Sequence, residues 1–229
     1  MNFAEEKLFF IHIPKTAGTS VRRVLRPRYT DDEFVPVYSH EPSELQKIRN
    51  RLDDARVLYG HFSHGFHELL DTRGRYATML REPIARVWSF YRHQLHNPRA
   101  SYHAMVHSGM PLDDLLEGNN IHELNNHMTR IVSGHVGLEF VDDDSLLTRA
   151  IENIERDFLF VGLVERMAES MASLSRILGW RSIPDPPFVN VGSEAADSRI
   201  DPLVRQAIER FNRLDLALYR WVANLEDRG

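Results

Sequence analysis

The sequence predicts an α/β protein in which helices cover both faces of a central parallel sheet. Three observations support this prediction. Strand-like and helix-like segments alternate through the first half of the 229-residue chain. An apolar run near the N-terminus leads through a lysine- and glycine-containing loop into a helix, and a second strand leads through a proline into another helix. Helical patterns dominate the second half, so the sheet comes mainly from the first half.

The elements of the first half are short apolar runs bounded by turn or helix-start signals. Proline at the first helical position marks the beginning of two of the helices. Strands are expected at residues 8–13, 34–37, 56–59 and 76–80, and helices at 18–25, at 42–51 and from Pro83 onward.

Residues 101–156 are mostly helical in pattern. Three aspartates at 142–144 precede an apolar stripe at helical spacing, and we interpret them as an N-terminal cap rather than as metal ligands. The stripe comprises Leu146, Leu147, Ala150, Ile151 and Ile154.

A buried strand is expected at 158–162, followed by a helix and then by one long final helix from Pro202. Met167, Met171, Leu174 and Leu178 line one face of the first of these helices and are interpreted as core. The final helix is expected to bury Val204, Ile208, Phe211, Leu214, Leu218 and Trp221 or Val222.

Composition limits the function classes. Lys and Arg total 28 against 33 Asp and Glu, which gives a net charge of −5 and argues against nucleic acid as the main partner. The chain has no cysteine, which excludes disulfides, thiolate catalysis and Cys-ligated zinc. It shows no signal peptide and no apolar run of bilayer-spanning length, so we expect a cytoplasmic protein.

The residues between the first strand and the first helix are typical of a phosphate-binding loop. N–H groups of such a loop and of the first helical turn have no partner inside the helix, and the helix dipole adds positive charge. Lys15 adds a full charge, Gly18 allows close approach of the backbone, and Thr19 and Ser20 offer hydroxyl donors. The candidate cradle comprises Pro14, Lys15, Thr16, Ala17, Gly18, Thr19 and Ser20.

This cradle differs from a Walker A loop, in which the lysine directly follows the last glycine and another glycine lies five positions upstream. Here Lys15 precedes the single glycine, and residues 12–14 stand where the first glycine would be. Taken alone, the segment is also compatible with an ordinary strand–turn–helix with a capped N-terminus.

A second candidate segment begins with Arg81, which follows a strand at the edge where open α/β sheets bind ligands. Ser89 lies two turns into the helix that starts at Pro83, and it can face the same crevice. The alternative is that Arg81 pairs with Glu82 or caps a carbonyl group.

Together the two segments resemble the PAPS-dependent sulfotransferases, where PAPS is 3′-phosphoadenosine 5′-phosphosulfate. Residues 14–20 resemble the family's 5′-phosphosulfate loop, and Arg81 and Ser89 have the spacing of its 3′-phosphate motif. The form of the loop is most similar to the branch with carbohydrate enzymes such as heparan sulfate 2-O-sulfotransferase and bacterial relatives. Weaker similarity at 125–130 and 160–166 extends the resemblance over nearly the whole chain. It implies one sulfotransferase domain, 1–229, with a three-layer α/β/α P-loop-type fold.

The resemblance implies transfer of a sulfuryl group from PAPS to an acceptor hydroxyl, with release of PAP. Lys15 is the candidate group for stabilising the charge on the leaving phosphate, and no metal is required because lysine and backbone amides can meet that charge. A carbohydrate or glycoconjugate acceptor is expected, while a lipid-linked or small-molecule acceptor stays open. The sequence does not define the oligomeric state.

His61 is the candidate catalytic base. It follows Gly60 after a strand, and the carbohydrate branch has its catalytic histidine in such a Gly-His pair. One alternative is a metal site made with His64 and His67 at three-residue spacing, and another is a structural histidine. We expect His64 and His67 to face acceptor or solvent.

Two further residues have open roles. Arg130 can contact acceptor or cofactor, or pair with an acidic residue, and Arg199 is a weak candidate for nucleotide binding near a loop, 184–198, that closes over the nucleotide in the resembled family. A nucleotide-dependent kinase and a non-catalytic PAP- or nucleotide-binding protein are the alternative functions. The position of Lys15 argues against the kinase.

Overall fold

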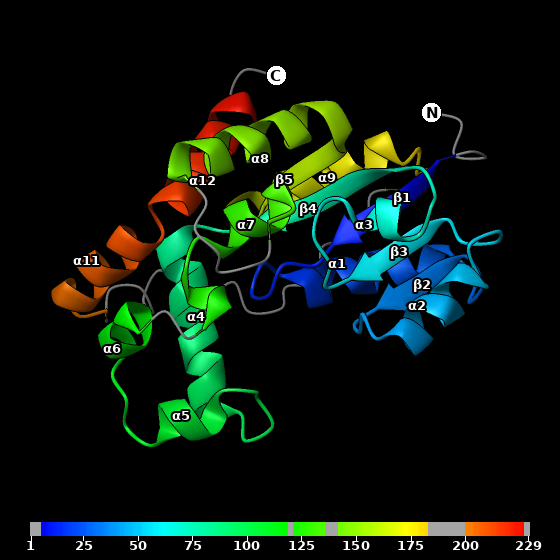
Figure 1. Cartoon of the computed structure of the whole chain (residues 1–229). Coiled ribbons are helices and arrows are strands. Elements are labelled where there is room, and N and C mark those ends of the chain that lie inside the picture. Colours follow the sequence, from blue (N-terminus) through cyan, green and yellow to red (C-terminus); the bar gives the residue numbers. More distant parts are fainter. Residues whose placement is uncertain (1–5, 119–120, 136–141, 183–199, 227–229) are drawn as a thin grey trace.

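The computed structural model describes residues 6–118, 121–135, 142–182 and 200–226 (Figure 1). Its centre is a sheet of 5 parallel strands in the order β2-β3-β1-β4-β5. The chain moves from β1 to one side for β2 and β3 and to the other side for β4, so the end of β1 is a point where the strand order reverses. Ligands bind at such a point in open α/β sheets. The strands are β1 Lys7–Ile11, β2 Phe34–Val37, β3 Val57–Gly60, β4 Gly74–Leu80 and β5 Phe158–Leu163.

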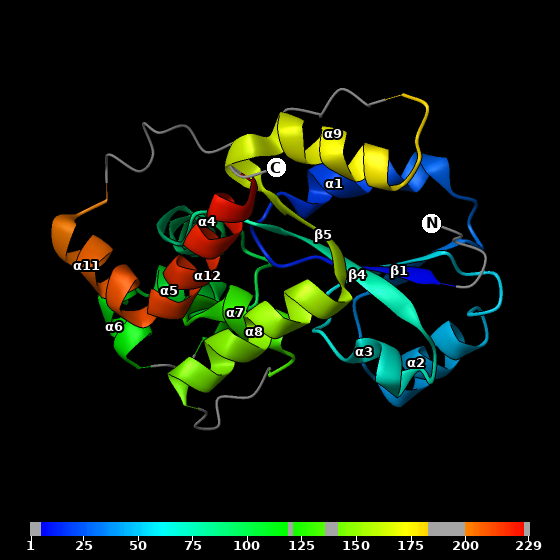
Figure 2. The ribbon, with the colours of Figure 1, turned by 90° about the horizontal axis from the view of Figure 1, so that it is seen from above.

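Helices cover both faces of the sheet, which confirms the expected three layers (Figure 2). Alternation along β1 sends Leu8 and Phe10 to the face covered by α1 (Gly18–Leu25) and α9 (Met167–Ile177). Phe9 and Ile11 point to the opposite face. That face is covered by α2 (Pro42–Arg49), α3 (Phe66–Leu69), α7 (His127–Ser133), α8 (Asp143–Asp157) and α12 (Arg213–Glu226).

A third apolar cluster lies beyond the sheet, around α4 (Pro83–His96). Val87 and Phe90 of α4 pack against short helices that follow it and against α11 (Pro202–Phe211). Figure 1 shows this arm of helices extending from the sheet. The remaining elements are α5 (His103–His107), α6 (Leu112–Glu117) and the 3₁₀ turns η1 (Arg26–Arg28), η2 (His122–Leu124) and η3 (Val164–Arg166).

The predicted long final helix is wrong, because the chain breaks at Asn212 into α11 and α12. The Asn212 backbone leaves helical geometry at φ −125° and ψ 30°. Its fully buried side-chain amide donates to the carbonyl oxygens of Leu124 (2.8 Å) and Ile208 (3.0 Å), and its oxygen accepts from the Asn126 N–H (3.1 Å). These bonds satisfy a buried polar side chain, which explains the break.

The other helix assignments of the second half are confirmed where the structure describes them. Asp142 caps α8, since its carboxylate accepts from the Ser145 N–H at 3.0 Å. Met171 and Leu174 are buried under α9 as core. Within the described ranges, none of the helices is both long and apolar enough for a bilayer crossing.

A buried charge anchors α7 to α12. Asp215 and Arg86 are both fully buried, with Asp215 Oδ2 and Arg86 Nη2 3.8 Å apart. Asp215 also accepts from the N–H groups of Met128 (3.1 Å) and Thr129 (2.8 Å), which are orphan donors of the first turn of α7. Asp215 therefore caps α7 from a remote element and fixes where Arg130 lies.

Candidate functional site

The loop between β1 and α1 is held in an unusual backbone conformation. Lys15 (φ 71°) and Ala17 (φ 60°) are both left-handed, although neither is glycine. Between them Thr16 turns back, and both its N–H (3.3 Å) and its hydroxyl (2.9 Å) donate to the Ile13 carbonyl oxygen. A backbone that alternates in this way can direct successive N–H groups into one concavity and bind an anion.

The N–H groups at the start of α1 are available to a ligand. Within the described part of the chain, those of Lys15, Ala17, Gly18 and Thr19 donate to no other group of the protein. The dipole of α1 adds positive potential at the same place. Ser20 is buried and Thr19 is exposed. Both donors of Thr16, its N–H and its hydroxyl, are already used on the Ile13 carbonyl oxygen.

Gly18 has a role that the sequence did not indicate. A Cβ atom there would lie 1.9 Å from Cδ2 of His12, so the glycine makes room for the His12 ring beneath the loop. The Tyr59 hydroxyl donates to the Gly18 carbonyl oxygen at 2.6 Å, which ties the first turn of α1 to β3. The shape of the cradle therefore depends on aromatic side chains below it.

Arg81 meets the cradle. It directly follows β4, the sheet neighbour of β1, and its Nη1 donates to the Lys15 carbonyl oxygen at 3.2 Å. Burial, and then the charge of Arg81, lowers the pKa of Lys15. The two predicted cations lie together, and the carbonyl contact anticipated as an alternative for Arg81 is also present. Glu82 caps α4, since its side chain accepts from the Ala85 N–H at 2.7 Å.

Ser89 lies half-buried on α4. His93 is one turn further along the same helix face, and its pKa is lowered by burial and then by the charge of Lys15. This face of α4 is therefore within electrostatic reach of the cradle at His93, and the role of Ser89 stays a prediction.

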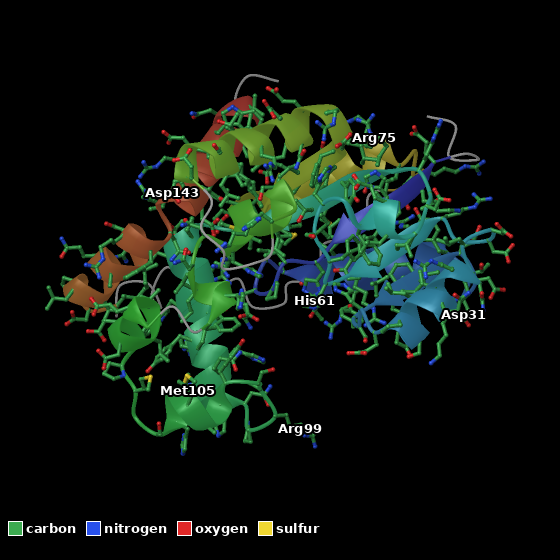
Figure 3. The ribbon with its side chains drawn as sticks, viewed as in Figure 1. Asp31, His61, Arg75, Arg99, Met105 and Asp143 are labelled. Carbon is green, nitrogen blue, oxygen red and sulfur yellow. The ribbon has the colours of Figure 1, made fainter. Side chains whose placement is uncertain are left out.

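His61 lies beside the cradle at the carboxyl end of β3 (Figure 3). Its N–H donates to the Val37 carbonyl oxygen at 2.8 Å, and a Cβ on Gly60 would lie 1.7 Å from that same oxygen, which explains the glycine of the Gly-His pair. The ring centroid of His61 is 4.7 Å from that of His12 and 5.1 Å from that of Tyr38. The His61 side chain is exposed at its edge but backed by these rings.

The surroundings of His61 favour its neutral form. Burial against its neighbours, and then the nearby His40, lowers the pKa of His61. A neutral imidazole near neutral pH can accept a proton, which is the requirement for a general base.

The expectation that His64 and His67 face acceptor or solvent is wrong. His64 Nε2 lies 2.7 Å from Asp157 Oδ2, and His67 Nδ1 lies 2.7 Å from the Tyr76 hydroxyl. These partners turn the two rings toward β4 and β5, because buried imidazole nitrogens need hydrogen bonds. Among the described residues, no set of three or more His, Asp or Glu side chains is arranged to hold a metal ion.

Sequence reasoning missed two histidines. His12 lies between Gly18 and His61, and burial, followed by the charges of His61, Arg22 and Lys15, lowers the pKa of His12 to about 4. On α7, burial, then the charges of Arg86 and His61, holds the pKa of His127 well below its usual range. The only signal for His12 was its place just before the cradle, and nothing in the sequence distinguished His127.

Arg130 is half-buried on α7, where burial lowers its pKa and Asp215 opposes that shift. Arg199 and the 184–198 loop lie outside the described residues.

Comparisons with known proteins give a matching family model, two curated relatives and one similar solved structure. A family model described as the sulfotransferase family matches residues 2–221. The chain is similar to galactose-3-O-sulfotransferase 3 of Bos taurus (25% identical) and of Homo sapiens (24%), with 92% of this chain and 54% of each relative covered. The chain thus spans about half the length of these curated relatives. A solved structure of mouse sulfotransferase SULT7A1 with PAP is similar over 90% of this chain and 62% of that one, with a TM-score of 0.47 and 14% identity.

Proposed function

We propose that this chain, which belongs to the sulfotransferase family, transfers a sulfuryl group from PAPS to a hydroxyl of a carbohydrate or glycoconjugate and releases PAP. The observation that carries the proposal is the contact between Arg81 Nη1 and the Lys15 carbonyl oxygen at 3.2 Å. It brings two cations from segments 66 residues apart to one edge of the sheet. PAPS carries phosphate at two positions of one adenosine, and it requires such a pair.

In this proposal the cradle, Pro14 to Ser20, holds the 5′ end of PAPS, and the donors are the backbone N–H groups of Lys15, Ala17, Gly18 and Thr19. The Lys15 ammonium neutralises charge that grows on the bridging oxygen as the S–O bond breaks. Arg81 and Ser89 bind the 3′-phosphate. The burial that lowers the pKa of Lys15 also strengthens its interaction with an anion, since water is partly excluded.

His61 acts on the acceptor. The acceptor oxygen forms a bond to sulfur while the phosphate oxygen leaves on the opposite side, and the hydroxyl proton goes to the neutral His61 ring. The exposed ring of Tyr38, 5.1 Å from His61, offers an apolar face against which a sugar ring can pack. The similarity to galactose-3-O-sulfotransferases supports a sugar hydroxyl as the acceptor class.

Thermal denaturation with nucleotides provides the first test. We expect PAP to raise the Tm of the protein without Mg²⁺, and we expect the Lys15→Met variant to lose most of that shift. Stabilisation that requires ATP and Mg²⁺ would instead favour a kinase. Exposed Lys47→Met is the matched control, because it removes the same charge on α2 without touching the cradle.

Mass-spectrometric detection of sulfated product, with PAPS and a panel of galactosides, is the second test. A mass increase of one sulfuryl group, absent for Lys15→Met, supports the proposal. PAP binding without transfer to any galactoside or other hydroxyl acceptor would favour the non-catalytic alternative.

The single-domain organisation and the cytoplasmic location remain predictions.

A further inference from the structure

A second cavity, of about 540 Å³, lies at the opposite edge of the sheet from the cradle. Leu8 is at the beginning of β1 and Arg56 immediately precedes β3, whereas the cradle and His61 follow the ends of these strands. The segment after α1 and the segment after α9 form the other walls, and Figure 2 shows them side by side. The cavity is therefore separate from the proposed transfer site.

Among the described residues, the charged side chains that line this cavity are Arg28, Arg56 and Arg181. The Nε of Arg56 contacts Glu33 Oε1 at 2.9 Å, so its charge is largely balanced. Arg28 lies over the Trp180 ring, 4.1 Å from the centroid, and its Nη2 donates to the Ser182 carbonyl oxygen at 3.3 Å. The remaining guanidinium donors of Arg28, together with the exposed Arg181, give the cavity an excess of positive charge suited to an oxyanion.

An aromatic wall stands beside the arginines because of how α9 ends. Gly179 is left-handed at φ 67°, and the Trp180 N–H donates to the Ser175 carbonyl oxygen at 2.9 Å. This C-terminal motif turns Trp180 back toward the sheet. Burial raises the pKa of Tyr29, so its side chain is a neutral phenol. A hydrogen bond from Trp180 opposes this shift, which places the phenol beside the indole.

We propose that this cavity binds a small anionic ligand, namely a sulfate or phosphate monoester carried on a ring. Arg28 and Arg181 take the ester oxygens, and Trp180 and Tyr29 provide the surface for the ring. The volume is within the range of roughly 300–1,000 Å³ that small-molecule sites occupy. Such an ester is either a sulfated sugar or an adenosine phosphate, and the test separates these two sources.

The test uses the full chain with Lys15→Met as background, so that the contribution of the cradle to binding is reduced. Isothermal titration is carried out with galactose 3-sulfate, with PAP and with unsubstituted galactose. We expect one of the two anionic probes to bind, and the one that binds identifies the source. In the Arg28→Ala/Arg181→Ala variant the affinity should fall about ten- to hundredfold, the effect of losing charge-assisted hydrogen bonds.

Arg149→Ala is the matched control, since Arg149 is an exposed arginine of α8 and not part of the cavity. Arg181→Glu, a charge reversal at an exposed position, keeps the test valid if the double variant does not fold. The proposal is overturned if neither anionic probe binds, if galactose binds as well as the anions, or if the arginine variants bind as tightly as Arg149→Ala. None of these measurements depends on turnover, so they can be interpreted even if sulfuryl transfer is not found.

Discussion

Replacing Gly18 by alanine tests whether the cradle depends on the His12 ring beneath it. The new Cβ would lie 1.9 Å from Cδ2, 2.0 Å from Nε2 and 2.5 Å from Cγ of His12. The ring has little room to move, because its centroid is 4.7 Å from that of His61 and 5.7 Å from that of Tyr59. Either the ring or the first turn of α1 must therefore shift.

Overpacking of this kind costs about 1–3 kcal/mol of unfolding free energy. Alanine has a better helix propensity than glycine by up to about 1 kcal/mol, but Gly18 is the first residue of α1, so little of that gain applies. For a chain of this size, the expected loss lowers the Tm by roughly 2–12 °C. PAP binding should weaken as well, because the free N–H groups of the cradle move with the first turn.

Urea denaturation and PAP titration measure both effects. Gly118→Ala is the matched control, because Gly118 is exposed and has right-handed backbone, so alanine there should be neutral or slightly stabilising. In a His12→Ala background, Gly18→Ala should cost about 1–3 kcal/mol less than in the native chain, since the clash is gone. An equal cost in both backgrounds, or no cost in either, would refute the reasoning.

Three other predictions concern neighbouring parts of the molecule. His61→Gln should lower kcat roughly 10²–10⁴-fold while PAP affinity is retained, and near-native turnover of this variant would exclude the base role. In the native protein, the acid limb of the pH profile of kcat/KM should lie below pH 6.5, because the pKa of His61 is lowered. Asp215→Ala should cost about 3–5 kcal/mol in chemical denaturation, because it leaves Arg86 buried without its counter-charge, and a loss near zero would contradict that account. The pKa of His12 is about 4 in the folded protein and 6.5 in the unfolded chain, so the unfolded chain binds a proton more readily. The contribution of His12 to the free energy of unfolding is therefore complete above pH 6.5, and it decreases toward pH 4 by up to about 3 kcal/mol. His12→Asn should flatten the dependence of unfolding free energy on pH in that window, and an unchanged slope would argue against it.

Much of the fold could be predicted because its signals are local. The helix at Gly18–Leu25 and the strand at Phe34–Val37 have the predicted bounds, since apolar periodicity and flanking turn residues act within a few positions. The Asp142 cap of α8 is equally local, with donor and acceptor three residues apart. The long final helix failed for the opposite reason, because Asn212 bonds to residues 124 and 126 and no local pattern records such partners.

Residue types and their order picked out a lysine loop and an arginine after a strand as candidates, and the resemblance to sulfotransferases added the Gly-His pair and the significance of the serine eight positions after that arginine. Only the tertiary structure decided that Arg81 touches the Lys15 backbone, that Gly18 is small because of His12, and that His64 and His67 point away from the cradle. The second cavity depends on packing in the same way, since Arg28 meets the Ser182 carbonyl across 154 positions of sequence. Contacts between residues so far apart in the sequence arise from how the sheet and the helices pack. A sequence pattern indicates only interactions between residues a few positions apart, so it does not reveal these contacts.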